Sequence, residues 1–355
     1  MNAKLGEWTV TVTTFIGAIY FYLIIAYYGV EEYFLEGPMK DYLNSNVVHL
    51  EVFISGIFLG ILFVLIKQLT EKRFFRRKSF GFNILFKSGL YLLAIIAVGV
   101  LVYYLFLYSG LVSAVQMEAY QELLSSQFLL SILVYFGFII LLMNFMIFVN
   151  RKLGPGTLLD VLTGKYHHPR NEELIFLFLD LKGSTSLAEK LGHSIYSRFL
   201  KECIHELTPV IQKYKAKVYQ YVGDEVVLFW EKKEGLNQLN CIGTFFEFND
   251  ILKTRENYFS AKYGQTPEFK AGMDTGIVTA TEIGDIKRDI AFHGDVLNTA
   301  SRLEKKCNEF NEKLIVSQHL TDQILSDDKY QLKFLSDLPL TGKTENVKFY
   351  GVENN

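Results

Sequence analysis

Two aspartates stand where predicted strands end or turn. Asp180 ends the apolar run LIFLFLD, and Asp224 occupies the turn of YQYVGDEVVLFW. A hairpin beside the first strand would bring the two carboxylates together, and they would repel each other unless cations lay between them. Two divalent ions held in this way can bind both oxygens of an in-line phosphoryl displacement. The pair indicates two-metal chemistry, although Gly-Asp turns are also common in hairpins for their conformation alone.

The residues that follow Asp180 form a glycine turn that leads into a helix. Gly183, Ser184 and Thr185 come directly before the helical sequence SLAEKLG. Backbone N–H groups at the start of a helix can face the phosphate that a bound cation accompanies. Ser or Thr here can also be an ordinary helix cap, and the residues alone leave both interpretations open.

A further polar pair lies in the segment GDVLNTASRLE, which starts at Gly294. Asn298 and Arg302 are four residues apart, so they share one face of the predicted helix. An asparagine can orient a ribose, and an arginine can bind phosphate. Taken alone, the segment is equally an amphipathic helix whose polar face is solvated.

The candidate residues must be positioned by regular secondary structure. From Leu174 onward, the sequence pattern alternates predicted strands with predicted helices. Strands are predicted at 174–180, in both arms of KVYQYVGDEVVLFW, and at 269–278, 289–292 and 314–317; helices are predicted up to Tyr214 and at 236–263 and 295–310. The order β-α-β-β-α-β predicts an α+β ferredoxin-like core with additions at its end. Many activities share such a fold, so the motifs must carry the functional argument.

Together the three segments resemble the class III nucleotidyl cyclase family of adenylate and guanylate cyclases. FLDLKGST is similar to the first-metal motif, YVGDEV to the second, and GDVLNTASRLE to the Asn-x-x-x-Arg helix, and the similarity covers roughly residues 174–352. The resemblance implies a homodimer with its active sites at the interface. One chain would hold two Mg²⁺ or Mn²⁺ ions per site at Asp180, Leu181 and Asp224, and the other would supply Asn298 and Arg302.

The reaction that this resemblance implies makes a cyclic nucleotide and pyrophosphate from a nucleoside triphosphate. One metal lowers the pKa of the ribose 3′-hydroxyl that attacks the α-phosphate, and the other neutralises the leaving polyphosphate. Arg302 would stabilise the charge that develops on the α-phosphate.

The positions that read the base depart from the family pattern. Members that use ATP commonly carry Lys four residues before the second-metal Asp, and Asp or Thr seven residues before the ribose Asn; this chain has Gln220 and Ala291. Glutamine can pair with either purine, whereas alanine offers no polar group. Because the Glu and Cys usual for guanine are also absent, ATP is the preferred substrate and GTP the alternative.

The cations expected to bind the polyphosphate are matched in part. Lys287 and Arg288 lie near the expected basic position before GDVLNTASR, and Lys343 follows the glycine of LPLTGK. Thr341 replaces a cation that family members often carry, and Lys182 is expected to point to solvent.

The first half of the chain differs in composition. The 355 residues carry a formal net charge of −2, which gives no general attraction to nucleic acid. Apolar stretches at 8–28, 47–66, 89–109 and 128–149 each approach the ~20 residues that cross a membrane. They are apolar all round, which disfavours a soluble bundle. We predict a four-helix transmembrane domain at 1–150, which contacts membrane lipid, a cytoplasmic linker at 151–173 and a catalytic domain at 174–355.

Positively charged residues predict the orientation of these helices. The loop after the second stretch is rich in such residues: Lys67, Lys72, Arg73, Arg76, Arg77, Lys78 and Lys87. Because cationic loops remain on the cytoplasmic side, both termini and the catalytic domain are predicted to be cytoplasmic, in a bacterial inner membrane. The cysteines Cys203, Cys241 and Cys307 have no disulfide or metal-site spacing and fit free thiols in a reducing compartment.

Other polar or small residues suggest packing rather than chemistry. Gly56 and Gly60 form a GxxxG pattern that allows two helices to approach closely, and Asn144 is placed to hydrogen-bond across a helix interface. His167 and His168 are adjacent in a polar loop and lack a partner at ligand spacing, so we expect them to be solvated.

Two rival interpretations of the soluble half are disfavoured. A diguanylate cyclase would carry a second glycine and a Phe in the turn that here reads YVGDEVV. A non-enzymatic relay would carry damaged metal or arginine positions, whereas Asp180, Asp224 and Arg302 are all present.

Overall fold

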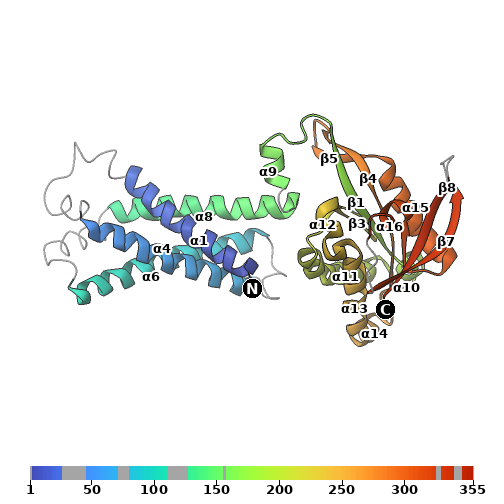
Figure 1. Ribbon diagram of the computed structural model, residues 1–355. Helices are drawn as coiled ribbons and strands as arrows, with labels where there is room; N and C mark the ends of the chain where they lie inside the picture. The colour runs from blue at the N-terminus through green and yellow to red at the C-terminus, as the bar shows by residue number, and fades with distance from the viewer. Residues whose placement is uncertain are drawn as a thin grey trace. The chain divides into compact units, whose positions relative to one another are not determined.

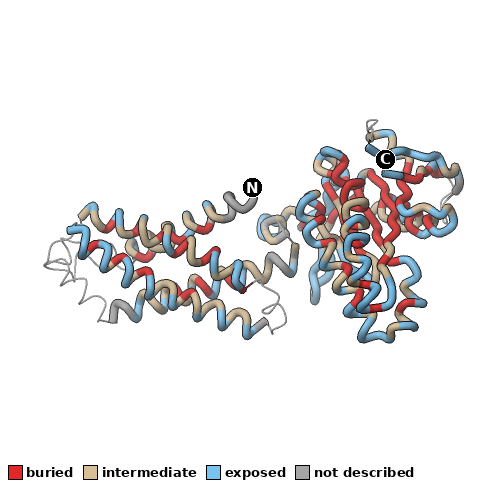
Figure 2. The backbone as a smooth tube through the Cα atoms, turned by 90° about the horizontal axis from the view of Figure 1, so that it is seen from below, coloured by how far each residue is buried: buried red, intermediate tan, exposed pale blue. Residues whose placement is uncertain are grey.

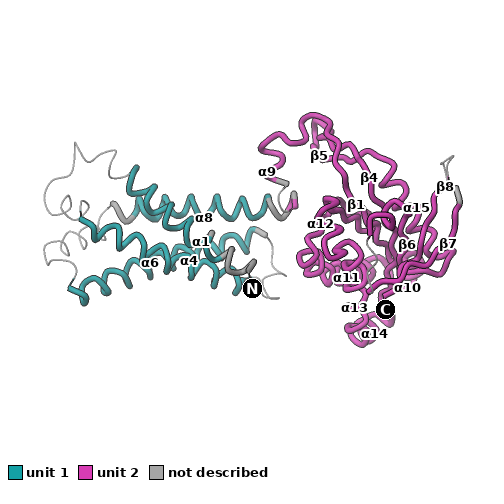
Figure 3. Tube along the Cα trace, in the orientation of Figure 1, with its two compact units in different colours: residues 1–149 teal, residues 150–355 magenta. Residues whose placement is uncertain are grey.

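The computed structural model describes residues 2–25, 45–70, 80–110, 127–154, 157–324, 329–339 and 346–354. The chain divides into two compact units, Met1–Val149 and Asn150–Asn355 (Figure 3). Most of the loop cations that predict the membrane orientation lie outside the described residues, as do Thr341 and Lys343.

Long helices make up the described part of the first unit (Figure 1). They are α1 (Asn2–Leu23), α4 (Asn46–Thr70), α6 (Phe80–Ser109) and α8 (Gln127–Leu153). Within the described ranges, three are long and apolar enough to cross a membrane, namely α4, α6 and α8. The described apolar part of α1 is shorter, Thr11–Leu23. Large apolar side chains such as Leu93, Val134 and Phe138 are exposed on these helices, as lipid-facing surfaces require.

The GxxxG pattern of α4 packs against α1. A Cβ on Gly56 would lie 2.4 Å from Cγ1 of Ile16, and one on Gly60 would lie 2.9 Å from Cα of Val12. The predicted close approach of two helices is therefore confirmed, within one chain. The prediction for Asn144 is wrong, because its amide donates to the carbonyl oxygen of Ile140 at 2.9 Å, one turn earlier in α8. That carbonyl lies within reach on the same helix and accepts from one N–H of the amide.

The second unit is built around a mixed sheet whose described strands follow the order β2-β3-β1-β4-β6-β8-β7, with β5 paired to β4. The strands are β1 (Arg170–Leu181), β2 (Lys217–Val222), β3 (Glu225–Glu231), β4 (Phe269–Ile283), β5 (Asp289–His293), β6 (Leu314–Ser317), β7 (Tyr330–Pro339) and β8 (Asn346–Asn354). The helices are α9 (Thr157–Leu162), α10 (Ser184–Leu191), α11 (His193–Lys213), α12 (Lys232–Leu236), α13 (Asn240–Thr254), α14 (Glu256–Tyr263), α15 (Asp295–Phe310) and α16 (Gln318–Thr321). A short 3₁₀ turn, Asn237–Leu239, joins α12 to α13.

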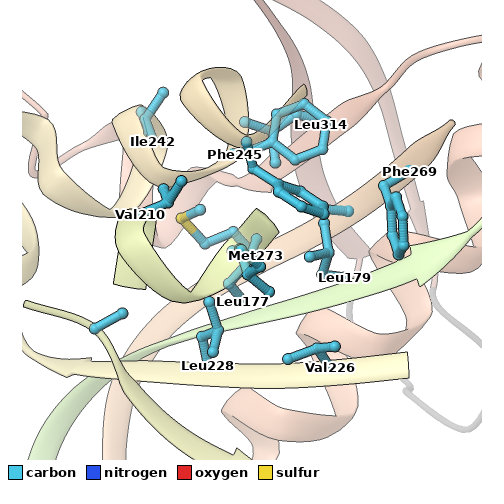
Figure 4. Close-up of a cluster of buried hydrophobic side chains, with 14 of the residues drawn as sticks. Leu177, Leu179, Val210, Val226, Leu228, Ile242, Phe245, Phe269, Met273 and Leu314 are labelled. Atoms are coloured by element: carbon cyan, nitrogen blue, oxygen red, sulfur yellow. The ribbon is translucent and has the colours of Figure 1, made fainter. Parts of the chain in front are cut away.

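Alternation along β1 divides the core between the two faces of the sheet. Leu177 and Leu179 point to the face covered by α11 and α13, where Val210, Ile242 and Phe245 pack against them (Figure 4). Figure 2 shows that buried stretches of the second unit gather at its centre. Residues of opposite parity, such as Phe176 and Phe178, join a second cluster that includes Val296 and Ala300 of α15. Asp180 shares this parity and therefore belongs to the α15 face.

The predicted helix at 236–263 is wrong as one continuous element. Gln238 and Leu239 adopt left-handed backbone angles, with φ of 49° and 52°, and α13 begins only at Asn240. Arg255, with φ of −97° and ψ of 6°, then separates α13 from α14. Hydrophobic periodicity does not report such backbone breaks, so the pattern joined the end of α12, the 3₁₀ turn, α13 and α14 into one helix.

A close contact fixes α15 against the sheet. A Cβ on Gly272 of β4 would lie 2.2 Å from both the carbonyl oxygen of Ala300 and the backbone nitrogen of Glu304. Only glycine leaves room for the helix backbone at this distance. The strand sequence KAGMD therefore sets how near α15 comes to the sheet.

Candidate active site

The two aspartates lie at one edge of the sheet. β1 pairs with β3 in antiparallel register up to Leu179 opposite Val226, so Asp180 lies beside the hairpin that carries Asp224. The hairpin closes between Val222 and Glu225 with a two-residue turn. Gly223 has φ of +63°, the left-handed conformation that such a turn requires. The predicted hairpin with a Gly-Asp turn is confirmed.

The electrostatics of this edge disfavour a second negative charge. Burial, followed by the charges of Glu304 and Asp224, raises the pKa of Asp180 to about 7, and Lys270 opposes the rise. Oδ2 of Asp224 is buried and has no hydrogen-bond partner within the described structure. An unpartnered buried carboxylate oxygen is costly, and a cation would satisfy it.

The residues present fit a magnesium-type site. Among the described residues, no three His, Cys, Asp or Glu side chains cluster as a metal site. Two carboxylates suffice for Mg²⁺, however, because it keeps several waters and takes further oxygens from substrate phosphates. Leucine has no ligating side-chain atom, so Leu181 can contribute only its backbone carbonyl oxygen as a ligand.

The loop after β1 forms the predicted glycine turn. Gly183 has φ of 68° and precedes α10, and its carbonyl accepts a hydrogen bond from Ser186 Oγ at 2.9 Å. Ser184 is half-buried and Thr185 is exposed. The cap residue Gly183 has no side chain to cap the helix, so the first backbone N–H groups of α10 remain available to an anion. Lys182 pairs with Glu268 at 3.5 Å, and about half of its side chain is exposed.

Helix α15 presents the second polar pair away from its own sheet. Its buried face includes Thr299, Ala300 and Leu303, whereas Asn298 is exposed and Arg302 is half-buried. No ion pair or hydrogen bond holds Arg302 within the part of the chain that the structure describes. This face is therefore free to contact a ligand or a second chain.

The remaining predicted positions are not brought into contact with the aspartates. Gln220 is exposed on β2, and Ala291 is buried on β5 opposite Thr281. Lys287 pairs with Asp289 at 2.6 Å, and Arg288 pairs with Glu282 at 3.6 Å, all within the β4–β5 hairpin. His167 and His168 are exposed, as predicted, with ring centroids 5.0 Å apart.

Three residues near the aspartates were not assigned a role from the sequence, although Glu304 ends the quoted segment GDVLNTASRLE. Lys270 and Glu304 lie on the same face of the sheet as Asp180, and Lys270 Nζ is 3.5 Å from Asp180 Oδ2. Burial and the charges of Asp224 and Asp180 raise the pKa of Tyr196 on α11 to about 12, against the effect of its hydrogen bond with Ser184. A charged residue inside the buried strand FKAGMD was the available signal for Lys270.

Comparisons of the sequence with family models and with known proteins point to the same family. The family described as "Adenylate and Guanylate cyclase catalytic domain" matches residues 166–354. "Adenylate cyclase 2" of Rhizobium meliloti (strain 1021) is 33% identical over 176 residues, which cover 50% of this chain and 48% of the relative. The terminal-differentiation-specific adenylate cyclase of Dictyostelium discoideum is 22% identical over 187 residues, 51% of this chain and 9% of the relative. The chain thus spans about half the length of the first relative and less of the second.

A solved structure shows the same fold. The structure of a bacterial light-regulated adenylyl cyclase superimposes with a TM-score of 0.54 at 19% sequence identity, covering 64% of this chain and 66% of that one. At this identity the likeness concerns the fold alone.

Proposed function

Because this chain belongs to the adenylate and guanylate cyclase catalytic domain family, we propose that it is a membrane-bound adenylate cyclase. It converts ATP into 3′,5′-cyclic AMP and pyrophosphate at the interface of a homodimer. The observation that carries this proposal is the pair of Asp180 and Asp224 at one sheet edge, with a buried, unpartnered oxygen on Asp224. The relatives named adenylate cyclase support the choice of reaction.

Each site residue has a distinct task in this proposal. Asp180 and Asp224 hold the cations, with the backbone carbonyl of Leu181 as a further ligand. Two bound Mg²⁺ or Mn²⁺ ions supply activation of the ribose 3′-hydroxyl and neutralisation of the polyphosphate. Asn298 orients the ribose, and Arg302 stabilises charge on the α-phosphate. The backbone N–H groups from Gly183 to Thr185 face the phosphates.

A second chain completes the site in this account. Asn298 and Arg302 point away from their own sheet, so another copy is the natural recipient. Apolar side chains are exposed on the β2–β3 hairpin that carries Asp224, at Tyr221 and Val222, and at the other end of the sheet towards the β4–β5 hairpin, at Ile277, Ile283 and Ile286. Clustered exposed apolar groups mark protein interfaces and are unfavourable in water. They support a homodimer built through these hairpins.

The residues at the expected base-binding positions, Gln220 and Ala291, offer few contacts that distinguish adenine from guanine. Gln220 is exposed and offers both a donor and an acceptor, whereas the buried Ala291 offers no polar group to a base. ATP remains the preferred substrate. GTP is the alternative, because neither residue excludes guanine. Lys287, Arg288 and Lys343 are proposed to bind polyphosphate, for which the first two must leave their acidic neighbours.

The N-terminal unit anchors the enzyme. We assign α1 as a fourth spanning helix beside the three that meet the length and hydropathy criteria. The catalytic unit and both termini then lie in the cytoplasm, where ATP is available, and the membrane is the bacterial inner membrane. The strand order β2-β3-β1-β4 supports a ferredoxin-like core in the catalytic unit.

The proposal is tested by assaying the purified full-length chain in detergent with ATP and GTP in parallel. Each nucleotide is supplied with Mg²⁺ and with Mn²⁺, and the cyclic products are separated by chromatography. Formation of cyclic AMP in excess of cyclic GMP is expected. A preference for GTP would make the chain a guanylate cyclase, and no product from either nucleotide by a folded, dimeric chain would favour a signalling relay.

A further inference from the structure

A buried cation lies between the metal-binding edge and helix α15. Lys270 of β4 is directly opposite Asp180 of β1 in the sheet. Its Nζ is 3.5 Å from Asp180 Oδ2 and 2.6 Å from Glu304 Oε1 on α15. The side chains of Lys270 and Glu304 are only 10% and 3% exposed. The three charges thus form a chain that runs from strand β1 through strand β4 to the helix.

Stability alone is a poor explanation for this arrangement. Removing a charge pair from water costs several kcal/mol per ion, and well-packed apolar residues often replace such pairs without loss. Lys270 Nζ and Glu304 Oε1 are 2.6 Å apart, so the two charges are paired at close range inside the protein. Burying this pair therefore needs a reason beyond folding, and its contact with Asp180 suggests one.

The geometry restricts the Asp180 carboxylate. Lys270 engages the Oδ2 atom, which leaves Oδ1 for a cation shared with Asp224. Glu304 in turn holds Lys270 from the side of α15, and the close contact at Gly272 fixes the backbone of Glu304 against β4. Glu304 lies two residues after Arg302 on the same helix. The position of Asp180 is therefore linked physically to the helix that carries the nucleotide-binding pair.

We propose that Lys270 and Glu304 are positioning residues that hold Asp180 in its cation-binding orientation and tie it to α15. The inference rests on the proposed function for the identity of the bound group. It concerns metal binding rather than turnover, so it can be tested without any cyclase assay.

Electrostatics and positioning predict opposite effects of removing Lys270. A cation 3.5 Å from Asp180 repels an incoming metal ion, so its loss would strengthen metal binding if charge alone mattered. Loss of orientation would weaken binding instead, typically by about 10- to 100-fold when a group that orients a ligand is removed. The sign of the change therefore separates the two roles.

The experiment measures Mn²⁺ binding to the purified full-length chain by electron paramagnetic resonance, without nucleotide. Lys270→Met and Glu304→Gln are expected to weaken Mn²⁺ binding at least about 10-fold, and Lys270→Arg, which keeps the charge and reach, is expected to restore most of it. Lys306→Met is the matched control, because Lys306 forms an exposed ion pair with Glu309 on the same helix. It should bind Mn²⁺ like the wild type.

A double variant guards against misfolding. Lys270→Met with Glu304→Leu removes both charges of the buried pair together, leaves neither partner of that pair uncompensated, and should fold, as circular dichroism will show. Mn²⁺ binding by this variant that equals or exceeds that of the wild type would overturn the proposal, as would absence of binding by the wild type. A wild type that binds Mn²⁺ in this pattern yet forms no cyclic nucleotide would overturn the proposed function and leave the positioning pair standing.

Discussion

Gly272 on β4 lies directly beneath Glu304 on α15, where a Cβ would come within 2.2 Å of the Glu304 backbone nitrogen. The contact sets the distance between the sheet and the helix that carries Asn298 and Arg302.

Gly272→Ala should therefore displace α15. The added methyl group meets backbone atoms on α15 that cannot rotate away, and overpacking of this kind costs about 1–3 kcal/mol. We expect a lower melting temperature and strongly reduced cyclase activity. Thermal unfolding and product formation, both measured on the full-length chain, check this; unchanged values for both would show that α15 has room to spare.

Arg302→Ala should reduce turnover while the fold persists. Arg302 is half-buried without an ion-pair partner among the described residues, so its loss leaves no buried charge unpaired. Loss of one contact to the transition state typically costs about 10²–10³ in kcat. Lys305→Ala, on the exposed face of the same helix, is the control and should retain activity. Equal kcat for Arg302→Ala and wild type would remove Arg302 from the mechanism.

The stability of the metal-free protein should depend on Asp180 and on pH. The pKa of Asp180 is about 7 in the folded protein and near 3.8 in the unfolded chain, where its neighbours are absent. The folded state therefore binds the proton more tightly. The resulting stability is complete below the unfolded-state pKa and is lost as the pH rises through about 7.

In EDTA, the melting temperature of the wild type should therefore fall relative to that of Asp180→Asn as the pH rises from about 4 to about 7, and the difference should be level above that. Added Mn²⁺ should restore the wild type at pH 8 and leave Asp180→Asn unchanged. A difference between the two proteins that stays constant with pH would contradict the raised pKa.

Gly60→Leu should disrupt the N-terminal unit. A Cβ at Gly60 already lies 2.9 Å from Cα of Val12, so a leucine forces α1 and α4 apart. Gly99→Leu is the matched control, since a Cβ there meets no atom within 4 Å. Gel filtration in detergent after heating should show earlier aggregation for Gly60→Leu alone. Equal heat resistance of both variants would mean that this helix contact contributes little.

The sequence predicted the elements that carry the motifs and missed the contacts between them. Apolar runs and a Gly-Asp turn are local signals, so the β1 end, the hairpin and α15 were all predictable. Lys270 joins Asp180 only through the pairing of β1 with β4, and Glu304 only through the docking of α15 at Gly272. Neither relationship has a local signature. The break at Arg255 likewise depends on backbone angles that hydrophobic spacing does not encode.

The shared active site is tested most directly by mixing two inactive chains. Asp180→Asn lacks a metal ligand and Arg302→Ala lacks the phosphate contact, so each homodimer should be inactive. A co-expressed heterodimer combines the intact Asp180 of one chain with the intact Arg302 of the other in one of its two sites. Random pairing then predicts cyclic AMP formation at about a quarter of the wild-type rate. No product from the mixture, with the wild type active and heterodimers demonstrated, would contradict a site built from two chains.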